Sequence, residues 1–155
     1  LNTGHVSPAE AVRLIDLAGE YGIGRVLVAS AVTKEASLEE LQHMAAKGAF
    51  IEYTLAAYTH TTPIPKTHYY VEREYASIDE GMDLGQTGSL RLAAEQIQAL
   101  GPEHCIIGTD FGVYTLPEPV EGLREFIACL LDLGFSPDDV RLLVKTNPER
   151  LLGMG

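Results

Sequence analysis

The sequence predicts an α/β fold in which helices cover a parallel sheet. Segments with apolar residues at helical spacing alternate along the chain with short runs that carry almost no charge. Such uncharged runs are typical of strands buried on both faces, which is the situation of strands in a parallel sheet. At 155 residues the chain has the length of a single domain, spanning residues 1–155.

The predicted helices have recognisable ends. Ser7-Pro8-Ala9-Glu10 combines a capping serine, a first-turn proline and an acidic residue ahead of apolar positions at helical spacing. Ser37 and Ser136 begin two further helices, and glycines end most of them. The predicted helices are residues 7–22, 37–47, 89–100, 120–133 and 136–145, followed by a closing segment from residue 147.

Between the helices lie the predicted strands, residues 25–30, 49–55 and 104–110, with residues 1–4 taken as the end of another. From residue 57 to 87 the periodicity is lost among Thr, Pro, Tyr and charged residues. A segment of this length without periodicity is more often a lid or binding loop than a passive connection, so we predict an inserted lid. The resulting alternation of strand and helix favours right-handed crossovers.

Composition excludes several classes of protein. Lys and Arg number 11 against 22 Asp and Glu, a net charge of −11, so a phosphate backbone would be repelled and a nucleic-acid partner is not expected. No run approaches the roughly 18 apolar residues of a bilayer span, so no membrane partner is expected. Cys105 and Cys129 lie in apolar stretches and are predicted to be buried free thiols in a reducing, cytoplasmic compartment.

Polar residues follow the predicted strands, at the edge where parallel α/β folds bind ligands. His5 follows Gly4 at a strand exit, which predicts a metal ligand or general base, with a structural loop histidine as the alternative. Asp110 ends an uncharged strand, where a carboxylate needs a metal, an arginine or backbone N–H groups. Capping of the following turn is the alternative for Asp110.

Several motifs together resemble a known family. TGHVSPAEAVRLIDLAGEYGIGRVLV, FIEYT, CIIGTDFG, PEPVEGLREFIACLLDLGFSPDDV and NPERLLGM are similar to the C-terminal half of an amidohydrolase-like metal-dependent hydrolase of the TIM-barrel type. The resemblance covers most of the chain outside residues 57–86. It implies a (β/α)8 barrel of which this chain supplies roughly the last four β/α units, and on that mapping the first half lies outside it.

The resemblance also implies a site. His5 matches a metal ligand after the fifth strand, and Asp110 matches the eighth-strand aspartate that binds metal and acts as general base. One or two divalent ions are implied, with Zn²⁺ the expected metal. Ser30 and Tyr53 stand where the resemblance, which is to an uncharacterised TIM-barrel subgroup of these hydrolases, calls for histidines, and a hydroxyl is a poor ligand for a metal that prefers imidazole.

Other residues are predicted to contact substrate rather than metal. Ser30, Glu52 and Tyr53 lie at strand ends, and His60 and His68 lie in the predicted lid. For the two lid histidines, exposed polar loop residues are the simpler interpretation. Glu52 could equally pair with an arginine or point into solvent.

Function therefore has three candidates. The first is a hydrolase in which metal-activated water attacks a carbonyl or ester of a small-molecule substrate. The second is a metal-dependent decarboxylase or lyase on the same barrel, since fold does not fix reaction. The third is a barrel depleted of ligands that acts as a binding or accessory subunit. In each case half a barrel has raw sheet edges, which predicts a homo-oligomer or pairing with the N-terminal half.

Overall fold

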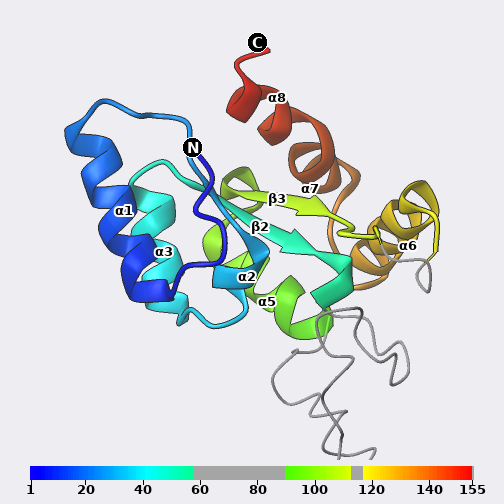
Figure 1. Ribbon diagram of the computed structural model, residues 1–155. Helices are drawn as coiled ribbons and strands as arrows, with labels where there is room; N and C mark the ends of the chain where they lie inside the picture. The colour runs from blue at the N-terminus through cyan, green and yellow to red at the C-terminus, as the bar shows by residue number, and fades with distance from the viewer. Residues whose placement is uncertain (58–89, 113–116, 155) are drawn as a thin grey trace, which may run out of the picture.

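The computed structural model describes residues 1–57, 90–112 and 117–154, and its centre is a parallel sheet (Figure 1). The three strands lie side by side in the order β1 (Leu27–Val28), β2 (Phe50–Thr54) and β3 (Cys105–Gly108). Leu27 pairs with Phe50, and Ile51 pairs with Cys105. The predicted α/β class with a parallel sheet is confirmed.

The first residues of the chain widen the sheet by a fourth parallel segment, which lies beside β1. Asn2 forms an isolated parallel bridge with Leu27. The Leu27 N–H donates to the Leu1 carbonyl at 2.9 Å, and the Leu27 carbonyl accepts from the Thr3 N–H at 3.0 Å. The sheet therefore runs from residues 1–3 through β1 and β2 to β3, in the order of the sequence, in agreement with the strand end predicted for residues 1–4.

Helices connect these segments and close the chain. The longer ones are α1 (Pro8–Glu20), α3 (Leu38–Ala46), α5 (Leu90–Leu100) and α6 (Pro119–Asp132). The shorter ones are α2 (Ser30–Thr33), α7 (Pro137–Arg141) and α8 (Asn147–Leu152), with a π-helical turn at Leu142–Thr146 and 3₁₀ turns at Leu55–Ala57 and Pro102–His104. None of the described helices is both long enough and apolar enough to cross a bilayer.

Three helices begin with the same reciprocal cap, as the serine pattern predicts. In each, the serine hydroxyl accepts a hydrogen bond from a backbone N–H three residues on, and the acidic side chain at that position accepts one from the serine N–H. These cap carboxylates are Glu10 of α1, Glu40 of α3 and Asp139 of α7. The hydrogen bonds with serine lower the pKa of all three carboxyl groups.

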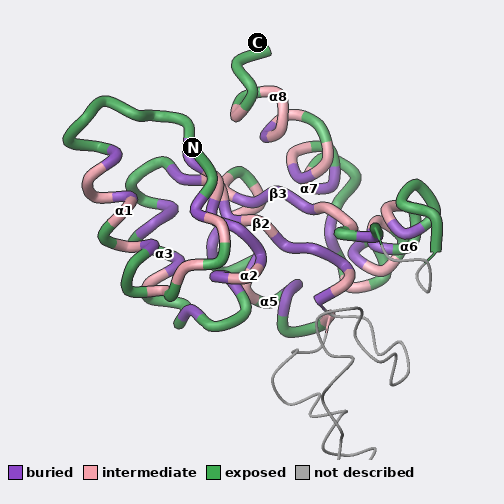
Figure 2. Tube along the Cα trace, in the orientation of Figure 1, coloured by how far each residue is buried: buried purple, intermediate pink, exposed green. Residues whose placement is uncertain are grey.

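One face of the sheet forms the hydrophobic core. Val28, Ile51 and Tyr53 are 0% exposed and belong to one cluster with the buried residues of α1, α3 and α5. Helix α1 packs against α3, and α3 against α5, so the crossover helices follow one another along this face (Figure 1). Figure 2 shows the buried stretches concentrated in the strands and on the inner sides of these helices.

The other face of the sheet is only partly covered. Side chains alternate along a strand, so Leu27, Phe50 and Glu52 lie opposite the core, and all three are half-buried. Ile106, the register partner of Glu52, is buried but lies outside the core cluster. The Arg150 guanidinium of α8 lies over the Phe50 ring, 6.0 Å from its centroid, at the end of the sheet where the strands begin.

Asn147 ties the C-terminal helices to β3. Its side chain is 0% exposed, and its Nδ2 donates to the carbonyls of Pro102 at 2.8 Å and Cys105 at 2.7 Å. The predicted separate closing segment from residue 147 is instead α8, which continues almost directly from α7 through the π-helical turn. Pro148 does not interrupt it because a proline is tolerated in the first turn of a helix.

The predicted strand at residues 25–30 is too long. β1 ends at Val28, and α2 begins at Ser30. The chain turns here because the Ala29 carbonyl accepts hydrogen bonds from the N–H groups of Val32 at 2.9 Å and Thr33 at 3.2 Å. Four residues with little helical periodicity gave no signal for this turn.

The described residues test two predictions about the fold only in part. Residues 58–89 lie outside them, so of the predicted lid only Ala57 is described, at the end of a 3₁₀ turn. The described sheet is part of a β/α fold, and the complete eight-stranded barrel stays a prediction.

Candidate functional site

The carboxyl ends of the strands bring three of the predicted site residues to one edge of the sheet (Figure 1). Because the strands are parallel, the residues that follow them lie along the same edge. His5 follows the 1–3 segment, Ser30 follows β1, and Asp110 follows β3. His5 and Asp110 are exposed and belong to the two outermost segments, whereas Ser30 lies between them.

Asp110 adopts a backbone conformation that few residues other than glycine adopt. Its φ is 55°, the one positive φ of a non-glycine residue in the described part of the chain. Such a residue costs on the order of 1–3 kcal/mol, and strain of this kind is concentrated at functional sites. The turn is held by Thr109, whose carbonyl accepts from the Ala56 N–H at 3.0 Å and whose Oγ1 accepts from the Phe111 N–H at 3.4 Å. Thr109 therefore supplies the cap, which leaves the exposed Asp110 carboxylate facing solvent.

A buried polar network lies beside Ser30. The Ser30 N–H donates to Glu52 Oε2 at 3.1 Å, and the Thr54 hydroxyl donates to Ser30 Oγ at 2.8 Å. Thr3 Oγ1 accepts from the Ala29 N–H at 2.9 Å. The side chains of Thr3, Ser30 and Thr54 are each 7% exposed. This network joins three neighbouring segments of the sheet at their carboxyl ends.

Glu52 and Tyr53 have opposite environments although they are adjacent in sequence. Glu52 is half-buried and reaches Ser30, so the structure places it within the network. Tyr53 is 0% exposed and lies in the core cluster on the helix-covered face. The structure therefore does not bring Tyr53 together with Ser30 and Glu52. His60 and His68 lie outside the described residues.

The donor atoms that a metal would need are spread along the edge. Across residues 1–57, 90–112 and 117–154, no three His, Cys, Asp or Glu side chains are grouped closely enough to hold an ion. His5 and Asp110 are three inter-strand steps apart in the sheet, and each step is about 4.8 Å. Both have the ligand chemistry that Zn²⁺ accepts, imidazole nitrogen and carboxylate oxygen.

Neither cysteine has the environment of a nucleophile. Both are free; Cys105 is buried and Cys129 is half-buried. Burial, together with the charge of Glu103, strongly raises the pKa of the Cys105 thiol. Burial, and then the charges of Glu125 and Asp132, raises the pKa of Cys129. Thiols with raised pKa values are poorly nucleophilic. The predicted burial holds for Cys105 and only in part for Cys129.

A second cluster of charged groups links α1 to α3. Asp16 Oδ1 lies 3.2 Å from His43 Nε2 and 3.2 Å from Lys47 Nζ. The hydrogen bond with His43, followed by that with Lys47, lowers the pKa of Asp16. His43 is exposed, and its contact with Asp16 joins two neighbouring helices on the surface.

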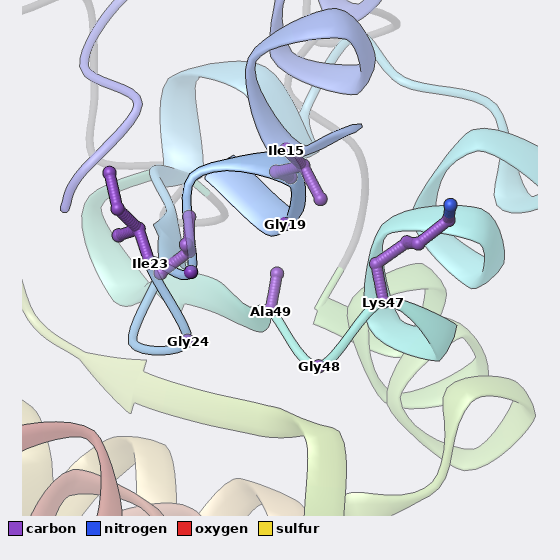
Figure 3. A pocket seen from close by; sticks show the side chains of 9 residues that line it. Ile15, Gly19, Ile23, Gly24, Lys47, Gly48 and Ala49 are labelled. Carbon is purple, nitrogen blue, oxygen red and sulfur yellow. The ribbon is translucent and has the colours of Figure 1, made fainter. Parts of the chain in front are cut away.

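A small hollow lies at the opposite edge of the sheet, where β1 and β2 begin (Figure 3). Its volume is about 180 Å³, less than the roughly 300–1,000 Å³ of typical ligand pockets. Lys47 is its one charged residue, and in Figure 3 this side chain extends away from Ile23. Because the Lys47 ammonium is paired with Asp16, the hollow offers little polar chemistry.

Sequence reasoning missed Thr3 and Thr54 as members of the polar network. Threonine is β-branched and common in strands, so its presence there gives no indication of a second role as a hydrogen-bonding partner. The available signal was the position of each threonine: Thr54 is the last residue of β2, and Thr3 is the last residue of the 1–3 segment that pairs with Leu27.

Comparison with known protein families finds a match to part of the chain. Residues 1–52 match a protein-family model described as a family of unknown function (DUF6282). No curated protein and no solved structure matches the chain. The matched region contains His5, Ser30 and Glu52, so three of the predicted site residues fall within it.

Proposed function

We propose that this chain is the C-terminal half of a (β/α)8 barrel that acts as a metal-dependent hydrolase of the amidohydrolase type. The order of the sheet is the observation that supports it best. Four parallel segments follow one another in sequence order, with the crossover helices packed in the same order along one face. The strands of a (β/α)8 barrel follow one another in this order, whereas in a doubly wound sheet the strand order reverses at a switch point.

The proposed centre holds a divalent metal, with Zn²⁺ the expected ion, between His5 and Asp110. Both residues fit such an ion by donor type and by exposure at the ligand-binding edge. When bound, the metal supplies a water whose pKa is lowered to about 7. His5 contributes an imidazole ligand. Asp110 contributes a carboxylate that can accept a proton from the attacking water as a carbonyl or ester of a small-molecule substrate is cleaved.

A barrel depleted of metal ligands is the second candidate, and two side chains favour it. The Ser30 hydroxyl is engaged by Thr54 within the buried network, and Tyr53 lies in the core. The two strand ends where the resemblance calls for histidines therefore offer no imidazole. On this reading the chain binds a small molecule or partner without catalysing a reaction.

Closure of the barrel needs four further strands. We assign these to a second copy of the chain or to an N-terminal half, because the partly covered face and the two outer strands require a partner. A cytoplasmic setting, without membrane or nucleic-acid partner, completes the proposal.

Zinc binding tests the proposed centre. Calorimetric titration of the protein with Zn²⁺ should show binding that weakens at least tenfold in His5→Ala and in Asp110→Asn. His43→Gln and Asp132→Asn are matched controls, because they make similar changes at exposed positions away from the edge. Zinc binding that is absent, or unchanged in both test variants, would leave the accessory role as the better account.

A further inference from the structure

Glu52 lies on the partly covered face with a single described hydrogen bond. Its Oε2 accepts from the Ser30 N–H at 3.1 Å. Among the described residues, no lysine or arginine forms an ion pair with it. A half-buried carboxylate with one backbone donor retains much of its need for positive charge or further donors.

The neighbouring Ser30 hydroxyl has one proton still to donate. The Thr54 hydroxyl uses its own proton in donating to Ser30 Oγ at 2.8 Å, so Ser30 acts as the acceptor in that bond. A serine hydroxyl also carries one donor, and no described bond uses it. Ser30 is 7% exposed and held by Thr54 and by its own N–H, which fixes its position relative to Glu52.

Two complementary chemical groups, the Glu52 carboxylate and the Ser30 hydroxyl, therefore lie side by side. Glu52 offers negative charge and a second carboxylate oxygen, and Ser30 offers a hydroxyl donor. A ligand that satisfies both has a cationic N–H group next to an acceptor oxygen. The net charge of −11 adds a general attraction for cations.

We infer that Glu52 and Ser30 form a subsite for an organic cation, in which an ammonium or amidinium group of the substrate contacts Glu52 and an adjacent carbonyl oxygen accepts from Ser30. The reaction of the bound substrate rests on the proposed function, because the subsite lies beside the strand ends that carry the proposed metal site. Binding at the subsite itself requires neither the metal nor the reaction.

Two small probes isolate the ammonium group. Glycinamide carries an ammonium next to an amide carbonyl, and acetamide carries the amide alone. In ¹H–¹⁵N NMR titrations at pH 7, the Ser30 N–H reports directly because it is bonded to Glu52. We expect a saturable shift of the Ser30 resonance with glycinamide, at millimolar concentrations, and at least tenfold weaker binding of acetamide.

Variants assign the effect to the two side chains. Glu52→Gln removes the charge and keeps an oxygen that can accept from the Ser30 N–H, and it should weaken glycinamide binding at least tenfold. Glu39→Gln removes the same charge from an exposed position on α3 and should leave binding unchanged. Ser30→Ala should weaken binding several-fold by removing the donor.

Equal binding of both probes to the wild-type protein, or undiminished binding by Glu52→Gln, would overturn the subsite. The wild-type comparison decides the matter even if Glu52→Gln does not fold. A Zn²⁺ titration separates this inference from the hydrolase proposal: zinc binding that needs His5 and Asp110, without glycinamide binding, overturns the subsite alone. Zinc binding that needs Glu52 would make it a metal ligand and would also overturn the subsite.

Discussion

Replacing Asn147 with leucine should destabilise the protein more than any surface substitution. The side chain is 0% exposed, and its Nδ2 holds the carbonyls of Pro102 and Cys105 at 2.8 and 2.7 Å. Leucine has the same number and branching of side-chain heavy atoms as asparagine, so the change removes two hydrogen bonds without opening a cavity. It also takes the side-chain donor away from the buried Cys105 carbonyl, whereas the Pro102 carbonyl keeps a hydrogen bond from the Cys105 N–H.

The expected loss follows from those two carbonyls. Losing the donor at the buried Cys105 carbonyl costs about 1–3 kcal/mol, and losing the bond to the Pro102 carbonyl, which keeps the Cys105 N–H, adds about 1 kcal/mol, so the expected loss is about 2–4 kcal/mol. This is a large share of a domain stability of about 5–15 kcal/mol. Urea unfolding followed by circular dichroism gives the free energy of unfolding for both proteins.

The same substitution at the chain's other asparagine is the control. Asn2 is exposed, and its Oδ1 accepts one hydrogen bond from the Gly4 N–H at 2.8 Å. Water replaces that bond in the variant, so Asn2→Leu should cost at most about 1 kcal/mol. If Asn147→Leu cost no more than Asn2→Leu, the side chain would not be the link between α8 and β3.

Two further predictions concern helices. Gly122→Ala on α6 places a Cβ against the Phe111 ring and should lower the free energy of unfolding by about 1–3 kcal/mol, measured in urea. Gly19→Ala on α1 meets open space and should raise the free energy of unfolding by about 0.5–1 kcal/mol. A Gly122→Ala protein more stable than the Gly19→Ala protein would refute the packing argument. The hydrogen bonds with serine hold the folded-state pKa values of the three cap carboxylates below their usual range. Their contribution to stability is therefore present above the unfolded-state pKa values and is lost as pH falls through the folded-state ones. Ser136→Ala should make stability less dependent on pH below about 4, and an unchanged acid profile would contradict this.

Local chemistry explains which elements the sequence predicts well. The caps at Ser7, Ser37 and Ser136 each need residues within three positions, so the pattern is complete in a short stretch of sequence. The short runs of β2 and β3, in which Glu52 is the one charged residue, are similarly self-contained. Elements fixed by distant contacts were predicted less well. The turn into α2 is held partly by Glu52, 22 residues further along the chain.

The same distinction applies to the candidate site. Strand ends predicted that Ser30 and Glu52 lie near ligands, but their mutual hydrogen bond depends on the register between β1 and β2, which the sequence does not reveal. The position of Tyr53 was predictable in principle. Alternation along FIEYT puts adjacent residues on opposite faces, so Glu52 and Tyr53 could not both face the site.

The metal site and the closure of the barrel depend on each other. One Zn²⁺ ion needs its ligand atoms about 2.0–2.2 Å away, so the donor atoms of His5 and Asp110 must come within about 4 Å of each other. In a flat sheet, three steps of about 4.8 Å separate their strands by about 14 Å. Curling of the sheet turns the outer strands toward a common axis, with the partly covered face inward. A chain that binds zinc through both residues should therefore have that face enclosed, and a chain with an open, flat sheet should not bind the ion through both.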